Sequence, residues 1–375
     1  MSGVECGCGN PQRYSAKSKC RSAAANWVGR LGVKSSGDQH YQLDMHLHKV
    51  TRRKFMTLLG ASWMTWPVVT RAQQPVKVFR VGFLAFGNAS TWANRVEALR
   101  GGLGDLGYIE GKNLIIEFRS TETIEQLAEY ATELVHSKVD LIFAPSSTET
   151  EVARKATNTM PIVFATHADP VGLGHVASLS RPERNITGLS GLGADLAVKA
   201  LEILKDAIPH AARFAVFLTP SAPWHHSFLQ AAKVAGAKLG VEVHTAPVQT
   251  TEDLDAAFAM AVREGVDGIC VQPTSLSRSY RVPMAELALK YRLPSVFGGR
   301  EYVEAGGLMS YAADYVDLTR RSATYIDKIL KGANPADLPV ELATKYLLAI
   351  NVTTAKKLEL NLPWFLQQRA DELIE

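Results

Sequence analysis

The sequence predicts an α/β protein of two doubly wound lobes, each with a mainly parallel sheet. From residue 76 onward, short apolar runs typical of strands alternate with longer segments whose apolar residues recur every three or four positions, as in helices. The alternation starts again near residue 199, and each half has about the length of one domain. Strands joined through helices of this length form right-handed crossovers, so the strands are expected to be parallel.

The first half has five expected strands and three expected helices. Val96, Leu99 and Leu103 lie three and four residues apart and so define one face of a helix over residues 92–106. Residues 140–144 are almost entirely apolar, which predicts a strand buried on both faces. The other expected strands are residues 78–84, 114–118, 162–165 and 186–189, and the other helices are 124–135 and 149–157.

The second half repeats this order without a visible sequence repeat. Its expected helices are residues 199–208, 228–239, 254–263 and 284–291, and its expected strands are 214–218, 241–244, 268–271 and 295–297. Residues 308–311, 318–330 and 345–350 then form a segment too short for a third domain. We expect this segment to return to both halves and complete them.

The first 72 residues differ from the rest of the chain in charge. They hold 11 Lys and Arg and 3 Asp and Glu, which leaves 30 and 34 in residues 73–375. The body is therefore mildly acidic, which disfavours a partner with a phosphate backbone, and nucleic acid is not expected as a partner. No run of about 18 apolar residues occurs, so a polytopic membrane protein is excluded.

Residues 45–72 have the parts of an export signal. Arg52 and Arg53 precede an apolar run over residues 55–70, and Thr70 and Ala72 form a small-x-small cleavage pattern with Arg71 between them. This pattern predicts a twin-arginine signal peptide cleaved near Ala72, and hence a periplasmic protein. An amphipathic helix is the alternative, but the run lacks the 3.6-residue period. Residues 1–44 are expected to be a disordered upstream extension; a metal site at Cys6 and Cys8 is the alternative there.

Several motifs match a function only superficially. The string at residues 102–107 fits Gly-x-Gly-x-x-Gly but lies at a helix end, where a terminator and turn are expected instead of a nucleotide site. The variant at residues 172–177 follows a strand only after a loop with Pro170. His225 and His226 are interpreted as a solvated helix end, and Cys270 as a core residue. Neither a cofactor nor a metal is expected.

Polar side chains follow several expected strands. In parallel sheets ligands bind at the carboxyl ends of the strands, where helix N-termini supply free N–H groups. Ser146, Ser147 and Thr148 are therefore expected to cradle an anion or a carboxylate, and Asp169 to accept a ligand amine. Thr219 and Thr274 occupy strand ends in the second half. Each residue could instead simply cap a helix; together they suggest a cleft between the lobes.

A set of strings spread over residues 76–375 resembles the substrate-binding proteins of ABC transporters, of the kind related to tryptophan and tyrosine uptake. The strings are FRVGFL at 79–84, LGYIEGKNL at 106–114, PIVF at 161–164, DPVG at 169–172, RNITG at 184–188, AGGLMSY at 305–311 and KILKGANPADLPVE at 328–341. The resemblance implies a type I periplasmic-binding-protein fold, with two lobes joined by a three-stranded hinge and a small ligand in the hinge cleft. It also implies ligand contacts for Ser146, Asp169, Thr187 and Tyr311.

The resemblance implies lobes at residues 76–188 plus about 305–335, and 189–304 plus about 336–375. We therefore expect an exported protein that is not an enzyme, captures an amino-acid-like or other small polar or aromatic solute, and delivers it to an inner-membrane permease. A racemase or dehydrogenase on the same two-lobed fold is one alternative, and a ligand-sensing domain is another.

Overall fold

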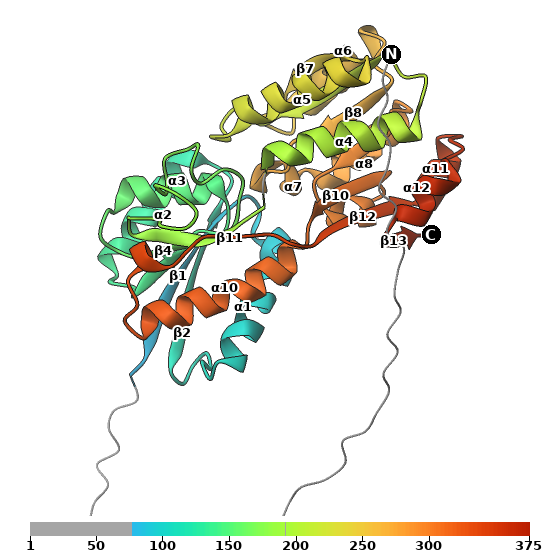
Figure 1. Cartoon of the computed structure of the whole chain (residues 1–375). Coiled ribbons are helices and arrows are strands. Elements are labelled where there is room, and N and C mark those ends of the chain that lie inside the picture. The colour runs from blue at the N-terminus through green and yellow to red at the C-terminus, as the bar shows by residue number, and fades with distance from the viewer. Residues whose placement is uncertain (1–76, 192) are drawn as a thin grey trace, which may run out of the picture. The chain divides into compact units, whose positions relative to one another are not determined.

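Two β-sheets organise the residues that the structure describes, which are 77–191 and 193–375 of a computed structural model (Figure 1). The two-lobed α/β class that the sequence predicts is confirmed. The predicted signal peptide and the predicted extension over residues 1–44 lie outside the described residues. Within the described ranges, no helix combines the length and the apolar character that a membrane crossing requires.

The first sheet has six strands in the order β11-β5-β4-β3-β1-β2, all paired in parallel. Its strands are β1 Phe79–Phe86, β2 Leu114–Thr121, β3 Leu141–Phe143, β4 Ile162–His167, β5 Ile186–Ser190 and β11 Glu341–Leu342. Successive side chains of β1 enter opposite cores, because strand side chains alternate between the two faces. Phe83 packs with α1 (Ala93–Asp105) and α10 (Tyr315–Leu330), whereas Leu84 packs with α2 (Ile124–His136) and α3 (Ser147–Ala156).

The second sheet has seven strands in the order β13-β12-β10-β9-β8-β6-β7. They are β6 Arg213–Leu218, β7 Glu242–Pro247, β8 Gly268–Val271, β9 Ser295–Phe297, β10 Met309–Ala313, β12 Tyr346–Asn351 and β13 Glu372–Ile374, and only β10 and β12 pair antiparallel. The central strands of this sheet are apolar along their length, because helices cover both faces of the sheet.

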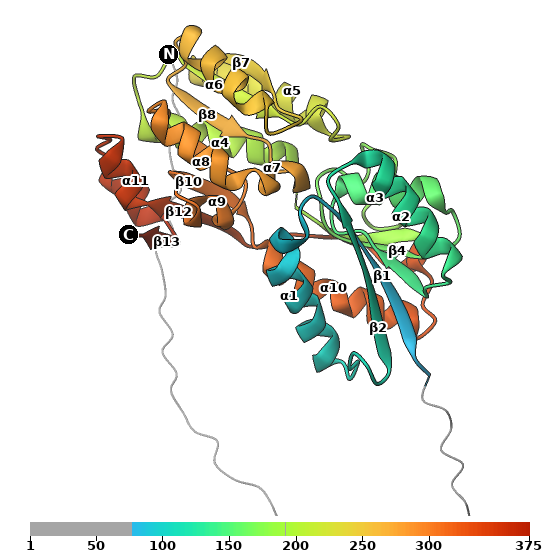
Figure 2. The ribbon, with the colours of Figure 1, turned by 180° about the vertical axis from the view of Figure 1, so that it is seen from behind.

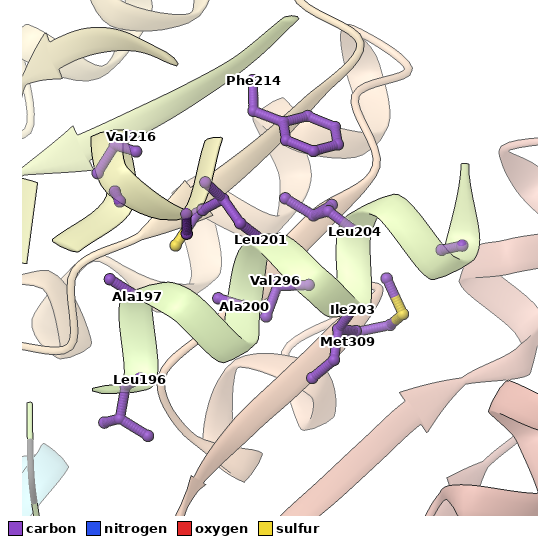
Figure 3. Close-up of a cluster of buried hydrophobic side chains, with 14 of the residues drawn as sticks. Leu196, Ala197, Ala200, Leu201, Ile203, Leu204, Phe214, Val216, Val296 and Met309 are labelled. Atoms are coloured by element: carbon purple, nitrogen blue, oxygen red, sulfur yellow. The ribbon is translucent and has the colours of Figure 1, made fainter. Parts of the chain in front are cut away.

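Helices α4 (Gly193–Ala207) and α5 (His225–Leu239) cover one face of the second sheet, and α6 (Asp253–Arg263) and α8 (Arg281–Lys290) cover the other. Figure 3 shows Leu201 and Leu204 of α4 beside Phe214 of β6. The remaining helices are α7 Ser275–Ser279, α9 Arg300–Glu304, α11 Val352–Lys357 and α12 Trp364–Arg369, with 3-10 turns η1 Ala89–Trp92 and η2 Pro335–Asp337.

The chain passes between the two sheets three times, after β5, after β10 and after β11 (Figure 2). The expected lobe boundaries need correction at these passages. Strand β10, expected in the first lobe, pairs with β9 and β12 of the second sheet, and β11, expected in the second lobe, pairs with β5 of the first. Backbone hydrogen bonds decide which sheet takes a short strand, and its own sequence does not reveal its partner.

The glycine-rich end of α1 confirms the expected helix terminator and turn. The helix continues through Gly102 to Asp105, and of the three glycines in residues 102–107, Gly107, which follows the helix, has a positive φ of 89°. A Cβ atom on Gly102 would lie 2.4 Å from the backbone oxygen of Arg320 in α10. Gly102 therefore permits the close approach of α1 and α10, and it does not open a helix as a phosphate-binding glycine would.

Candidate functional site

A small cavity of about 40 Å³ lies where strand ends of the two sheets meet. Both lobes contribute to its wall, because residues 146–148 and 166–168 follow or end strands of the first sheet, and residues 273–275 and 298 follow strands of the second. Its lining residues are Arg95, Ser146, Ser147, Thr148, Thr166, Ala168, Trp224, Pro273, Thr274, Ser275, Arg278, Gly298, Glu301, Tyr302 and Tyr315. The cavity thus occupies the position at which parallel sheets bind ligands.

The three hydroxyl residues at the start of α3 all line this cavity. Ser146 is the N-cap residue of α3, and its hydroxyl donates to the carboxylate of Glu149. The hydroxyl of Ser147 accepts a hydrogen bond of 2.9 Å from the backbone N–H of Ala168. Ser146, Ser147 and Thr148 are therefore brought together as the sequence predicts, and their contact with a ligand stays a prediction.

Two further threonines lie on the side of the second sheet. Thr274 lines the cavity and caps α7, because its hydroxyl accepts from the backbone N–H of Ser277 at 2.9 Å. Thr219 does not line the cavity, but its hydroxyl oxygen lies 3.0 Å from that of Thr274. Thr219 therefore lies behind the cavity wall, in hydrogen-bond contact with Thr274.

The buried carboxylate of Glu149 connects the two sides of the cavity. It accepts from the backbone N–H of Phe86 at 3.0 Å and from the hydroxyl of Ser275, in α7, at 2.8 Å, besides the hydroxyl of Ser146. Glu149 is wholly buried, and the hydroxyl of Ser275 also lies 3.2 Å from that of Ser146. This network joins α3 of the first lobe to α7 of the second.

Three predicted site residues lie away from the cavity. Asp169 closes its own turn, since its carboxylate accepts from the backbone N–H of Gly172 at 2.7 Å. Thr187 is wholly buried in β5 and donates to the backbone oxygen of Leu338 at 2.6 Å. Tyr311 stacks on Tyr346, with ring centroids 5.8 Å apart. The structure therefore does not bring Asp169, Thr187 and Tyr311 together with the hydroxyl residues.

Arg278, which the sequence reasoning missed, is the most unusual group in the cavity wall. Arg278 is 4% exposed, and neither its Nε nor its Nη2 has a hydrogen-bond partner among the described residues. The guanidinium lies 4.0 Å from the ring centroid of Trp92, a cation–π contact. Burial, together with the nearby charge of Arg95, lowers the pKa of Arg278 to about 9, so the group still carries its charge at neutral pH.

A second buried arginine lies in the same wall. Arg95 of α1 is 6% exposed and forms an ion pair of 3.3 Å with Glu301 of α9. Its guanidinium also lies 4.9 Å from the ring centroid of Tyr315. This pair joins the first lobe to the second. Arg278 forms no ion pair among the described residues, although the charges of Glu301 and Glu149 act on it.

Aromatic side chains form the apolar part of the wall. Trp224, Tyr302 and Tyr315 line the cavity, and Tyr302 stacks on Phe297 with centroids 4.9 Å apart. Trp224 and Tyr302 are among the aromatic residues that lie near expected strand ends in the sequence. Trp224 precedes α5, Tyr302 lies in α9 and Tyr315 begins α10, so only the fold brings them together.

A second cavity, of about 520 Å³, shares four residues with the first: Arg95, Arg278, Glu301 and Tyr315. Its size is within the usual range for small-molecule sites. Several of its charged groups already have partners, because Arg300 pairs with Glu372 at 2.6 Å and with Glu304 at 2.9 Å. The hydroxyl residues at the strand ends line only the smaller cavity.

A chain of hydrogen bonds runs from Ser147 away from the cavity. The hydroxyl of Ser147 lies 3.3 Å from Nδ1 of His167, which also accepts from the backbone N–H of Asp169 at 3.1 Å. That acceptor role places the proton of His167 on Nε2, 2.6 Å from Nδ1 of His175. Nε2 of His175 in turn lies 2.8 Å from the carboxylate of Glu151. This chain holds the loop after β4 against α3.

Both histidines resist protonation in the folded protein. Burial lowers the pKa of His167 well below 6.5, with a further contribution from His175, and burial also lowers the pKa of His175 despite its bond to Glu151. Although its own burial acts to raise it, hydrogen bonds from Arg154 and His175 hold the pKa of Glu151 at about 2. All three groups therefore favour folding at neutral pH over folding in acid.

We expect the free energy of unfolding to fall as the pH drops below about 6.5. In this range His167 and His175 bind protons in the unfolded protein but stay neutral in the folded protein. Each histidine contributes at most about 1.4 kcal/mol per pH unit. Urea unfolding between pH 7.5 and 5 measures the slope, which should be shallower in His175→Gln. The exposed His226 provides the matched control, and equal slopes in wild type, His175→Gln and His226→Gln would contradict the assignment.

The remaining candidate groups have structural positions. His225 and His226 begin α5, and Cys270 is buried in β8, where burial raises its thiol pKa to about 12. Residues 172–177 form turns and bends after β4. Among the described residues, no group of three or more His, Cys, Asp or Glu side chains is arranged to hold a metal ion.

Comparison with known proteins adds relatives of this two-lobed structure. A curated tyrosine-binding protein of Clostridioides difficile (strain R20291) is 27% identical over 260 residues, which cover 69% of this chain and 74% of that protein. A conserved domain protein of Vibrio cholerae is 27% identical, with a TM-score of 0.74, over 79% of this chain and 100% of that one. The ABC domain of Streptococcus pneumoniae solved with L-Trp is 24% identical, with a TM-score of 0.74, over 80% and 100%.

The likeness to solved structures confirms the predicted type I periplasmic-binding-protein fold. The profile described as "ABC transporter substrate binding protein" matches residues 81–374, which include strands of both sheets and every lining residue of the interlobe cavity. The chain therefore belongs to the ABC transporter substrate-binding protein family.

Proposed function

We propose that the protein is exported, captures a small amino-acid-like or other polar or aromatic solute between its lobes, and delivers it to an inner-membrane permease without catalysing a reaction. The observation that carries this proposal is the cavity at the strand ends, whose wall combines hydroxyl, aromatic and arginine side chains from both lobes. The curated relative that is named a tyrosine-binding protein supports an aromatic amino-acid-like ligand. Family membership supports a permease as the partner.

The contacts between the lobes suggest how capture would work. Ser275 reaches Glu149 and Ser146, and Glu301 reaches Arg95, so each lobe carries groups that contact the other. A solute held by residues of both lobes would favour the state in which they lie together. Exclusion of water from the cavity would strengthen its hydrogen bonds, and the permease would recognise the closed form.

The proposal places the protein in the periplasm. The paired Arg52 and Arg53 and the apolar run that follows support export by the twin-arginine route, with cleavage near Ala72. Residues 1–44 would then be dispensable for capture, because the signal lies after them.

Expression of the full chain in a bacterial host with an outer membrane tests the proposal. We expect processed protein in the periplasmic fraction and, in native mass spectrometry, a small molecule bound at one copy per chain. Mild unfolding should release this molecule, and its return should raise the unfolding temperature. Cytoplasmic retention would contradict export. Turnover of the recovered molecule would instead favour an enzyme on the same fold.

A further inference from the structure

Three hydroxyl groups of the cavity wall donate their protons to the protein itself. Ser146 and Ser275 both donate to the carboxylate of Glu149, the second at 2.8 Å. Thr166 donates to the backbone oxygen of Pro145 at 2.9 Å. A hydroxyl group has one proton and two lone pairs, so while these bonds hold, each oxygen can only accept a hydrogen bond from a molecule in the cavity.

The hydroxyl of Ser147 has the same polarity. Because Nδ1 of His167 accepts from the backbone N–H of Asp169, it has no proton of its own, and the Ser147 hydroxyl is the donor in their 3.3 Å contact. The Ser147 oxygen also accepts from the backbone N–H of Ala168, which leaves it one lone pair. Thr148, whose hydroxyl has no hydrogen-bond partner among the described residues, can donate or accept.

The negative charge of Glu149 lies directly behind the oxygens of Ser146 and Ser275. Glu149 is wholly buried and belongs to the first turn of α3, so its charge offsets the positive end of that helix. That positive end was the reason to expect a ligand carboxylate at Ser146. A ligand carboxylate would instead meet oxygens without available protons and a second carboxylate behind them, an arrangement that disfavours an anion and favours a cationic donor.

The contact between Ser146 and Ser275 lacks a proton. Their oxygens lie 3.2 Å apart, one from each lobe, although both protons are used on Glu149. Two oxygens that meet without a proton between them repel each other, and a donor that bonds to both removes the repulsion. An ammonium group has three N–H donors and no acceptor, so it matches a set of acceptor oxygens.

The charges around the cavity require an anionic group on the same ligand. Arg95 and Arg278 carry two positive charges, and Glu149 and Glu301 carry two negative charges, so the sum is zero. A cation alone would disturb this balance, whereas a zwitterion would not. Nε and Nη2 of the buried Arg278 have no hydrogen-bond partner among the described residues, and they are suitable donors for a ligand carboxylate.

We propose that the cavity binds a zwitterionic solute in one orientation, with its ammonium group on the oxygens of Ser146 and Ser275 and its carboxylate toward Arg278. The inference rests on the proposed function, because it assigns the subsites of the same cleft. It reverses the orientation expected from the sequence, in which Ser146 holds the carboxylate and Asp169 holds the amine. Asp169 lies away from the cavity and closes its own turn onto Gly172.

The size of the cavity adds a condition. About 40 Å³ holds little more than one water molecule, whose share of liquid volume is about 30 Å³. A solute of amino-acid size therefore enters only when Ser275 separates from Ser146. When the lobes close again, the ammonium group replaces the direct contact between these two oxygens.

Three probes that differ in charge test the inference on the full chain. L-tyrosine has both charged groups, tyramine lacks the carboxylate, and 3-(4-hydroxyphenyl)propanoate lacks the ammonium group. In calorimetric titration, with competition against L-tyrosine for the weaker probes, we expect each truncated probe to bind the wild type about 10- to 100-fold more weakly than L-tyrosine. A truncated probe that binds as tightly as L-tyrosine would overturn the inference.

Ser275→Ala removes one oxygen of the ammonium subsite. We expect it to weaken the binding of L-tyrosine and tyramine about tenfold and to leave the affinity for the propanoate within twofold. Ser279→Ala is the matched control, because Ser279 also lies in α7 and accepts from the backbone N–H of Asn88, in the first lobe, at 3.0 Å, but lines neither cavity. Loss of a contact between lobes should change all three affinities by the same factor, which the control measures.

Glu149→Gln adds an arm that keeps both serine hydroxyls. Its amide N–H donates to one of the two serine oxygens, whose proton then becomes available to the cavity, and the charge behind them is lost. We expect L-tyrosine and tyramine to bind at least tenfold more weakly, and the propanoate to bind as tightly as before or more tightly. Weaker propanoate binding with unchanged tyramine binding, in this variant or in Ser275→Ala, would place the carboxylate at the hydroxyls and overturn the inference. Equal changes for all three probes, or no change, would also overturn it.

The outcomes separate this inference from the proposed function. If the probes bind but the variants show the opposite preference, the solute-binding function stands and only the orientation fails. If no probe binds while native mass spectrometry finds a bound molecule, the inference fails and the proposed function stands. If no molecule is found either, both fail.

Discussion

Glu149→Ala should lower the free energy of unfolding by about 3 kcal/mol, because it leaves buried donors without an acceptor. The carboxylate of Glu149 accepts from the backbone N–H of Phe86 and from the hydroxyls of Ser146 and Ser275. Phe86 ends β1, and Ser275 begins α7 of the other lobe, so the loss affects both a strand end and a contact between lobes. Urea unfolding of the full chain, followed by circular dichroism, measures the change.

Two further variants show whether the network is responsible. Glu149→Gln keeps the size of the side chain and one acceptor oxygen, so we expect it to lose less than half as much stability as the alanine variant. Glu286→Ala removes a glutamate from an exposed position on α8 and should stay close to wild type. A loss under 1 kcal/mol in Glu149→Ala would show that water or neighbouring groups replace the carboxylate.

Gly102→Ala and Gly104→Ala should change stability in opposite directions, although both replace a glycine of α1. A Cβ on Gly102 would lie 2.4 Å from the backbone oxygen of Arg320 and 2.9 Å from Cβ of Ala323. The backbone of a packed helix cannot move away from the new methyl group as the end of a flexible side chain could. We therefore expect Gly102→Ala to lower the free energy of unfolding by about 2 kcal/mol. Gly104 has no atom within 4 Å of its Cβ position, and its replacement should add about 0.5–1 kcal/mol through helix propensity.

The pair of variants provides its own control, since the chemical change and the helix are the same. Thermal unfolding and urea unfolding of both proteins measure the difference, which we expect to be about 3 kcal/mol from the packing and propensity contributions together. Similar stability in both variants would mean that α1 and α10 can move apart at little cost.

The polar residues at the strand ends are the part of the site that the local sequence pattern predicted. Ser146, Ser147, Thr148 and Thr274 follow apolar strand segments, and the structure places all four in the wall of one cavity. The position of a residue after a strand of a parallel sheet is a local property that the sequence displays. Asp169 also follows a strand, but its turn directs the carboxylate to Gly172, a detail that depends on the loop geometry after β4.

The two buried arginines of the cavity wall could not be predicted from the local sequence pattern. Arg278 lies in the short polar helix α7, and Arg95 lies in α1, with nothing in either segment to distinguish it from a solvated surface cation. Each is buried because the other lobe covers it, and both lie over the ring of Trp92. Burial of such a charge depends on what packs over it from distant parts of the chain.

The sequence by itself determined the α/β class, the two halves, the longer helices and strands, and the family resemblance, because apolar period and turn residues act over a few neighbouring positions. It did not reveal the short helices α7, α9, α11 and α12 or the short strands β11 and β13. Tertiary structure alone decided that β10 joins the second sheet and β11 the first, that Gly102 serves helix packing, and that Arg278 is buried without a partner among the described residues. These properties depend on hydrogen bonds, steric contact and desolvation between segments far apart in the chain, which no local pattern encodes.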